Sequence, residues 1–286
     1  MPRAIPKDSP AARRIRSRLD ERIRSDALDL PLLPDSAARV MAACTSDGCD
    51  ARGLAEMIER DPSLASHVLR VANSAAYAPE VPIVSLQQAV SRLGTGMLCA
   101  IAVSVVTQGR VFDLPGHQPR LSRLWRHSAL TASWAREIAR LRRRNVEAAF
   151  LAGLLHDLGK PIVLAAVGAI EELGGLEIAP DLLEELLTDL HPAVGARLLQ
   201  AWDLPAWTRA AAAHHHAPDA APDHAEEART VCLADLLAHA SEEPDRDPLE
   251  AVRGHPVLQD LELYLDDVEE LLGHAARVEE FAKVFL

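Results

Sequence analysis

Aromatic residues are scarce in this chain. They make up only 3% of the 286 residues, so a buried core must be filled mainly by Leu, Val, Ile and Ala. Ala and Leu are strong helix formers. Residues 30–115 also show no alternation of polar and apolar side chains, which a half-buried strand would require. The sequence therefore predicts an all-α fold.

Long apolar runs and cysteine pairs are missing as well. The longest apolar run, Gly96–Val106, is too short to span a bilayer and predicts a buried helix. The charged N-terminal residues contain no apolar segment, so we expect no secretory signal. The absence of a CxxC pair favours a reduced, cytoplasmic compartment, and the four cysteines are Cys44, Cys49, Cys99 and Cys232.

The formal net charge of -12 excludes further classes of partner. A strongly acidic chain is a poor match for nucleic acid or for an anionic membrane surface. We therefore expect a soluble protein that binds neither nucleic acid nor membrane.

Composition and linker residues predict four regions. A polar N-terminal arm (1–29) precedes a first helical lobe (30–116), a second helical lobe (117–242) and a C-terminal helical extension (243–286) that packs on the second lobe. The arm carries six arginines between Arg13 and Arg24. Two interpretations of it stay open: a solvated helix or frayed tail, or a basic arm for an acidic partner.

Local signals predict where several helices begin and end. Asp61 followed by Pro62 is an N-cap with proline at the first helical position. Ser85 opens a helix that Gly94 stops, and Asn145 caps a helix of the second lobe.

Three further boundaries are predicted in the second half. His191–Pro192 is expected to start a new helix after one over Asp181–Thr188, because proline favours the first turn. Gly159 is expected to cap the helix that precedes it. A single amphipathic helix is expected to carry Val268 through Phe281.

The stretch Leu151–Lys160 contains an adjacent His156 and Asp157 in apolar surroundings. Imidazole and carboxylate are side chains that hold hard or borderline divalent cations. Burying them side by side is costly unless a metal ion or a polar network pairs with them. Both possibilities remain open from this pair alone.

Ligand-type residues recur on successive predicted helices of the second lobe. A helical bundle can build a metal site in this way, with each helix projecting one or two side chains into a shared core. The alternative is a set of core histidines that pair with carboxylates. The residues are His127, His156, Asp157, His191, His214, His215, His216 and Asp235.

The order His, His-Asp, His, His-His, Asp resembles the HD superfamily of metal-dependent phosphohydrolases. The first lobe sharpens this resemblance, because several of its motifs are similar to those of the HDOD domain. They are Leu33-Pro34, Ile58 to Pro62, Val68 to Ser74, Ile83 to Ala89, Leu93-Gly94 and, in the second lobe, Phe150 to Lys160. The resemblance covers about residues 30–240 and implies a two-lobed helical bundle whose second lobe is a metal-binding core.

The resemblance also implies roles for individual residues. One ion would be held by His127, His156, Asp157 and Asp235. Asp157 would bridge to a second ion held by His191 and His215, with His216 slightly outside the inner shell. Lys160 would face a substrate phosphate, so Asp157 and Lys160 are the candidate catalytic residues.

The implied cofactor is one or two divalent ions. Histidine and carboxylate ligands without thiolate are compatible with Fe, Mn, Zn, Ni or Mg. A pair of such ions is a common device for phosphoester hydrolysis.

Two departures from related HD-GYP phosphodiesterases bear on function. Ala217–Asp223 replaces their Gly-Tyr-Pro loop, and Arg123 stands where some of those enzymes have a glutamate. Two functions therefore remain. The first is a bacterial signal-transduction module that binds a signalling protein or a small nucleotide. The second is a metal-dependent phosphohydrolase acting on a nucleotide or cyclic nucleotide.

Overall fold

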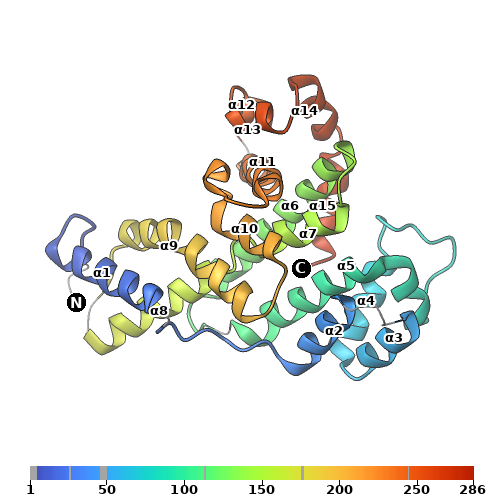
Figure 1. The fold of residues 1–286 in the computed structure, drawn as a ribbon, viewed down its shortest axis with the longest axis horizontal. Coiled ribbons are helices and arrows are strands. Elements are labelled where there is room, and N and C mark those ends of the chain that lie inside the picture. Colours follow the sequence, from blue (N-terminus) through green and yellow to red (C-terminus); the bar gives the residue numbers. More distant parts are fainter. Residues whose placement is uncertain (1–4, 26, 46–49, 113, 175–176, 244) are drawn as a thin grey trace.

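The computed structural model describes residues 5–25, 27–45, 50–112, 114–174, 177–243 and 245–286. Within these ranges the regular structure is helical, and the single extended pairing is an isolated parallel bridge between Ile5 and Ile178. The prediction of an all-α fold is confirmed. Figure 1 shows α2, α3 and α4 gathered at one end of the molecule, with α1, α8 and α9 at the other.

The first lobe is built around one long helix. That helix, α5, contacts all three of the shorter helices before it. A π-helical turn, Thr107–Val111, follows α5. The helices are α2 (Asp35–Thr45), α3 (Ala51–Glu59), α4 (Pro62–Ala72) and α5 (Leu86–Val106).

Local side-chain chemistry sets the helix ends in this lobe. Asp61 accepts hydrogen bonds from two backbone N–H groups in the first turn of α4, and Ser85 Oγ accepts one from Gln88 N–H at 3.4 Å. Gly94 adopts a φ of 76° and interrupts α5, as glycine can do without steric cost. The predicted stop at Gly94 is therefore present as a kink, after which the helix resumes.

In the second lobe, α6 lies between α7 and α11, while α8 packs on α9 and α9 packs on α10. The N-terminus of α7 is capped by Asn145, whose side chain accepts from Ala148 N–H at 3.0 Å. A short 3-10 turn, Pro218–Ala220, precedes the last helix of the lobe. The elements are α6 (Gln118–Leu141), α7 (Val146–Leu155), α8 (Gly159–Gly174), α9 (Pro180–Ala201), α10 (Ala206–His214) and α11 (Ala225–Glu242).

The predicted break at His191–Pro192 is wrong. Helix α9 runs unbroken through this point, with Pro192 inside it. Proline removes one backbone donor from a helix interior. Here the long packing contact of α9 with both α8 and α10 outweighs that loss. As a result His191 lies in the middle of a rigid helix.

The C-terminal extension contains four short helices, and two of them, α14 and α15, replace the single helix predicted for Val268 through Phe281. The helix breaks at Gly273–His274, and the segment after the break packs on α6. Phe281 and Phe285 place their rings 5.5 and 4.8 Å from that of Phe150. The helices are α12 (Pro248–Val252), α13 (Pro256–Asp260), α14 (Leu265–Leu272) and α15 (Ala275–Lys283).

The N-terminal arm contains a helix, α1 (Pro10–Arg24), that is docked on α9. Ile15 and Leu19 are buried, and Arg16 forms ion pairs with Glu185 and Asp189 of α9. The expectation of a solvated helix or frayed tail is wrong for this face. Ile15 and Leu19 are four residues apart among the arginines, a helical spacing that indicates an apolar face.

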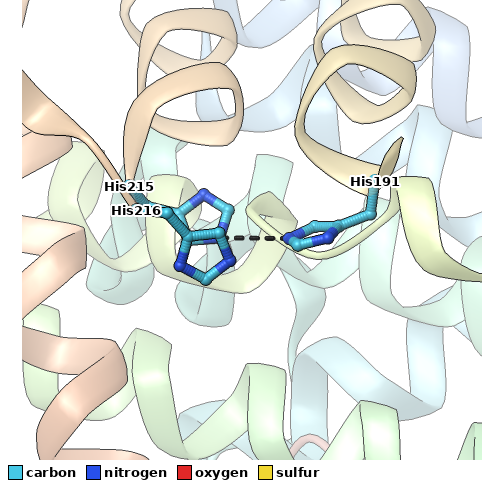
Figure 2. A group of neighbouring side chains, drawn as sticks. All are labelled: His191, His215 and His216. Atoms are coloured by element: carbon cyan, nitrogen blue, oxygen red, sulfur yellow. Dashed lines mark hydrogen bonds between the residues drawn. The ribbon is translucent and has the colours of Figure 1, made fainter. Parts of the chain in front are cut away.

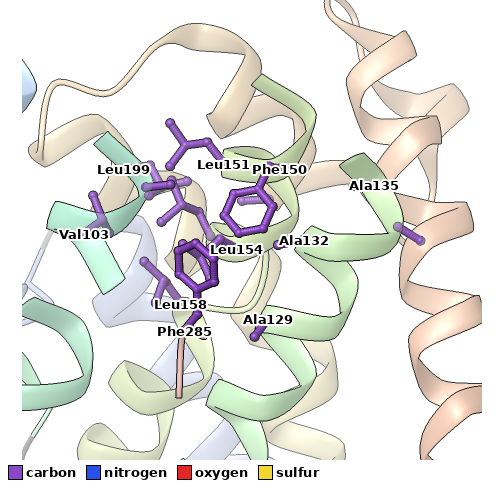
Figure 3. Packing of buried hydrophobic residues seen from close by; sticks show 14 of the residues in the cluster. Val103, Ala129, Ala132, Ala135, Phe150, Leu151, Leu154, Leu158, Leu199 and Phe285 are labelled. Carbon is purple, nitrogen blue, oxygen red and sulfur yellow. The ribbon is translucent and has the colours of Figure 1, made fainter. Parts of the chain in front are cut away.

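Small and large residues alternate where α6 meets α7. Figure 3 shows Ala129 and Ala132 of α6 beside Phe150 and Leu154, with Phe285 closing the same cluster. All five side chains are buried. The alanines let the backbones of the two helices come close together. This packing fixes the side chains that the two helices present to the interior.

In the part of the chain that the structure describes, two stretches are long and apolar enough to cross a membrane by length and composition: Leu86–Val106 and Val146–Glu171. Most of the apolar window in each is buried inside the protein, 67% and 83% respectively. The second stretch is also two helices, α7 and most of α8, separated by a turn. An apolar composition together with burial inside the protein is typical of the core helices of a globular domain.

Candidate metal centre

His127 and His156 come from the two helices that pack most closely. His127 lies on α6, and His156 follows the last residue of α7 in helical conformation. Both side chains are buried, and their ring centres are 5.5 Å apart. The central helix pair therefore contributes two imidazoles to one place.

A turn of three residues between α7 and α8 carries Asp157. Gly159 opens α8 where that helix crosses α9, and a Cβ at this position would lie 2.0 Å from the His191 carbonyl oxygen. The predicted cap role of Gly159 is therefore wrong: it begins a helix and permits a close crossing. The crossing brings His191 Nε2 to 3.1 Å from Asp157 Oδ1.

Three histidines meet between α9 and α10 (Figure 2). His191 projects from α9, and His215 and His216 follow the last residue of α10. His191 Nε2 lies 3.2 Å from His215 Nε2. His191 and His215 are fully buried, whereas His216 is exposed to the cavity described below.

Helix α11 supplies the second carboxylate. Asp235 Oδ1 is 2.8 Å from His127 Nε2 and 3.6 Å from His156 Nε2. The six residues His127, His156, Asp157, His191, His215 and Asp235 therefore form one cluster. They come from helices α6, α9 and α11, from the turn between α7 and α8 and from the residue after α10.

Two neighbours of this cluster were missed from the sequence. Glu242 accepts a hydrogen bond from His127 Nδ1 at 2.9 Å, and the His239 ring centre lies 4.3 Å from that of His127. Both residues follow Asp235 at helical spacing, four and seven positions later, and this signal could have found them.

Every buried histidine of the cluster uses its Nδ1 outside the centre. Nδ1 of His156, His191 and His215 points at a backbone carbonyl oxygen, at 2.7, 2.7 and 3.0 Å. A carbonyl oxygen can only accept, so Nδ1 carries a proton, and in the neutral form of each ring Nε2 presents a lone pair to the interior. Metal-ligating histidines show the same arrangement, in which an outer hydrogen bond fixes the tautomer.

The inward atoms lack donors. When both rings are neutral and protonated on Nδ1, the facing Nε2 atoms of His191 and His215 are two acceptors only 3.2 Å apart. Among the residues that the structure describes, the buried atoms His156 Nε2 and Asp157 Oδ1 contact only other ligand-type groups of the cluster, at 3.6 and 3.1 Å, and lack hydrogen-bond geometry. Leaving a buried polar atom unpaired costs about 1–3 kcal/mol. One or two cations between these residues would satisfy all four atoms.

The spacing of these atoms suits a divalent ion. Ligands about 2.1 Å from an octahedral ion lie about 3.0 Å apart when adjacent and about 4.2 Å apart when opposite. Among the contacts between histidine nitrogens and carboxylate oxygens here are 2.8 Å for His127 to Asp235 and 4.0 Å for His127 to Asp157. The ligand atoms of His127, His156 and Asp157 all lie within 4.8 Å of one another, and so do those of His191, His215 and His216. These spacings are close to those of ligands around one ion.

Neighbouring charged groups shift the pKa values of Asp157 and His127 in favour of their ionised forms. Burial alone would raise the pKa of Asp157, but His156, Lys160 and His191 hold the pKa well below its usual range. Burial lowers the pKa of His127, yet the hydrogen bonds to Asp235 and Glu242 outweigh this and raise the pKa to about 9. The carboxylates of Asp157 and Asp235 therefore stay ionised. Without a metal ion, a protonated His127 supplies a positive charge that partly neutralises them.

Burial has the opposite result for the α10 histidines. It lowers the pKa of His215 well below the usual value, helped by His156, and it lowers the pKa of His216 to about 4, helped by His191. Both rings are consequently neutral near pH 7, which is the form that binds metal ions.

A cavity of about 680 Å³ opens onto the cluster. His127, Asp157, His191 and His216 line its floor, and the rim is strongly charged. Lys160 reaches in and pairs with Asp157. Arg120 pairs with Glu184 across the cavity at 2.6 Å. The remaining charged groups on the rim are Arg123, Arg126 and Glu242.

Of the residues singled out from the sequence, one lies apart. His214 is half-buried near the end of α10 and is not among the residues that line this cavity. His216 and Lys160 lie at the edge of the cluster, where both are in contact with the cavity. Cys49 lies outside the described residues.

Known proteins share this arrangement of helices. A crystal structure from Shewanella amazonensis SB2B, provisionally described as a metal-dependent phosphohydrolase, superposes with a TM-score of 0.75 at 22% identity and covers 96% of this chain and 99% of that one. A provisionally described signal transduction protein from Marinobacter aquaeolei VT8 superposes with a TM-score of 0.67 at 23% identity, over 98% of this chain and 67% of that one. These similarities show a shared fold.

Sequence comparison gives the family. An uncharacterised protein of Treponema pallidum (strain Nichols) is 25% identical over 217 residues, which are 73% of this chain and 42% of that protein. The chain thus matches less than half the length of that relative. The HDOD domain family matches residues 30–218, well over half of the chain. The chain therefore belongs to the HDOD family.

Proposed function

We propose that this protein is a regulatory HDOD module whose second lobe holds one or two divalent cations. The observation that carries this proposal is a set of four imidazoles whose Nδ1 atoms are engaged elsewhere. The Nε2 atoms of His127, His156 and His191 lie within 4.0 Å of Asp157 or Asp235, and that of His215 lies 3.2 Å from His191 Nε2. A cluster that only filled the core would be expected to pair its inward atoms with donors.

The residues can be divided between two ions through the carboxylate they share. His127, His156 and Asp235 surround one side of Asp157, and His191 and His215 surround the other. Such ions, when bound, polarise water and neutralise phosphate charge. Histidine and carboxylate ligands are compatible with Fe, Mn, Zn, Ni or Mg.

A regulatory role is supported by the contrast between the cavity and the first lobe. Asp61, a buried carboxylate of the first lobe, accepts hydrogen bonds from the N-terminus of its own helix. No group of potential metal ligands was found among the described residues of that lobe. A lobe of this size whose described residues form no group of potential metal ligands is suited to binding a signalling protein or a small nucleotide.

A second function, hydrolysis of a phosphoester, is supported by the rim of the cavity. Lys160 holds its ammonium beside Asp157, and Arg123 lines the same cavity. Cations beside a metal centre can orient and neutralise a phosphate. Glu184 and Glu242 lie on the same rim and would repel a substrate that carries too much negative charge.

Cyclic di-GMP cleavage of the HD-GYP type is not proposed. Residues 217–223 form a short 3-10 turn and loop in place of a Gly-Tyr-Pro motif. Arg123 puts a cation where some of those enzymes place a metal-binding glutamate. A third ion beside it would be repelled.

Turnover of a panel of nucleotides, cyclic nucleotides and phosphodiesters with added Mn²⁺ or Fe²⁺ separates the two functions. The regulatory proposal expects metal binding by the wild type and equal inactivity of wild type and Asp157→Ala. Turnover that Asp157→Ala abolishes, with the variant still folded, would establish the hydrolase instead. Failure of the wild type to bind any divalent ion would overturn both.

A further inference from the structure

Two cysteines meet at the junction of the two lobes. Cys44 lies on α2 and Cys99 on α5, and both line a cavity of about 190 Å³. The Cys44 side chain lies within hydrogen-bonding reach of the Cys99 thiol, and both side chains face the same small cavity. Neither cysteine is in a disulfide in this structure.

We propose that Cys44 and Cys99 are an oxidative modification site, at which hydrogen peroxide or an organic hydroperoxide converts the two thiols into a disulfide. Two cysteines on different helices can be bridged only where the sulfur atoms already approach each other. Extensive packing of α2 against α5 holds this pair in place. The cavity gives a small oxidant a route to Cys99, which is otherwise buried.

The chemistry requires one oxidant molecule. The Cys99 thiolate attacks a peroxide oxygen and breaks the O–O bond, which gives a sulfenic acid and, with peroxide itself, one water after protonation. The Cys44 thiol then attacks the sulfenic sulfur, loses its proton and displaces the hydroxyl group as a second water. In total two thiols are oxidised, and one hydroperoxide is reduced.

The surroundings favour Cys99 as the attacking group. The hydrogen bond from Cys44 lowers the pKa of Cys99 against the opposing effect of burial. Cys232 on α11 offers a contrast within the same chain, because burial raises its pKa to about 12. A thiolate is the reactive form, so Cys232 should stay inert under conditions that oxidise the pair.

The disulfide would lie beside a contact that joins the lobes. Gly96 N–H donates to Glu147 Oε2 at 3.1 Å, which ties the second half of α5 to α7. Gly96 and Glu147 line the same cavity as the two cysteines. A bond between α2 and α5 would therefore stiffen the first lobe next to the helix that ends at His156.

The test uses the full-length protein and a modest excess of hydrogen peroxide at pH 7.5. Remaining thiols are then alkylated, and the protein is digested without reductant for mass spectrometry. We expect a Cys44–Cys99 linked peptide in the wild type and in Cys232→Ser. In Cys44→Ser we expect no link and a Cys99 sulfenic acid that dimedone traps.

Three results would overturn the proposal. The folded wild type could retain all its thiols under peroxide. It could form a link through Cys49 in place of either partner. Dimedone could label Cys232 in preference to Cys99 in Cys44→Ser. Circular dichroism of each variant before oxidation checks that the fold is intact, and the wild-type crosslink needs no substitution at all.

Discussion

Two buried carboxylates, one in each lobe, differ in how their oxygens are paired. In the first lobe, Asp61 is buried but accepts two backbone N–H groups at the start of α4. In the second lobe, Asp157 and His156 are buried with inward atoms that make no hydrogen bond within the described chain. A buried polar group whose partners are local is structural, whereas a cluster that lacks donors indicates a ligand. This contrast, more than the presence of histidine, locates the functional site.

The largest expected effect comes from the shared carboxylate. Asp157→Ala should weaken divalent metal binding by well over 100-fold, since even residues behind the ligands contribute about 10–100-fold. Isothermal titration of chelator-treated protein with Mn²⁺ or Zn²⁺ measures this loss. Equal affinity in the wild type and the variant would remove Asp157 from the site.

The helix crossing beneath that carboxylate offers the next test. Gly159→Ala should lower the free energy of unfolding by about 3 kcal/mol or more, because the new Cβ meets backbone atoms of α9 that cannot move aside. Gly168→Ala in the same helix has open space around its Cβ. It should raise stability by about 0.5–1 kcal/mol. Urea melts that give the two variants the same sign would contradict the close crossing.

Glu242 tests the surroundings of the ligands. Glu242→Gln keeps the shape of the side chain but removes the charge that holds His127 Nδ1. Metal affinity should fall by about 10–100-fold. The neighbouring Glu243→Gln alters only an exposed pair with Arg246 and should leave the affinity unchanged. An equal loss in both variants would indicate a general charge effect.

The pH dependence of the metal-free protein follows from His127. Its folded pKa of about 9 lies above the unfolded value of about 6.5. The stabilisation by this proton is therefore complete below pH 6.5 and is lost as pH rises to about 9. In chelator, the melting temperature of wild type should fall toward that of His127→Gln over this range. Parallel pH profiles for the two proteins would show that His127 does not carry the proton.

The smallest effect belongs to the first lobe. Asp61→Ala should reduce the free energy of unfolding by about 1 kcal/mol through loss of the α4 cap. Metal content should stay at the wild-type level. A loss of bound metal in this variant would contradict a purely structural role for Asp61.

The features that could be predicted from the sequence are those set by neighbours in the chain. The caps at Asp61, Ser85 and Asn145 depend on residues within one turn, and the structure confirms all three. Gly159 and Pro192 were misinterpreted because a local rule was applied where packing against another helix decides. A single sequence does not show which helices cross.

The site was predictable in part for the same reason. The ligand types on successive helices could be identified, but the direction of each Nε2 depends on tertiary contacts. Glu242 and His239 were missed because nothing in the sequence shows that His127 faces that side of α11. The helical spacing from Asp235 becomes informative once one contact between α6 and α11 is known.

The most direct test of a metal centre is anomalous diffraction from crystals of protein purified without added metal and then soaked in Mn²⁺. We predict a peak within coordination distance of Asp157 and of at least two of the Nε2 atoms of the cluster histidines, which are His127, His156, His191 and His215. If these side chains are fully ordered in their present positions after the soak and no anomalous peak appears among them, the proposed metal centre is contradicted.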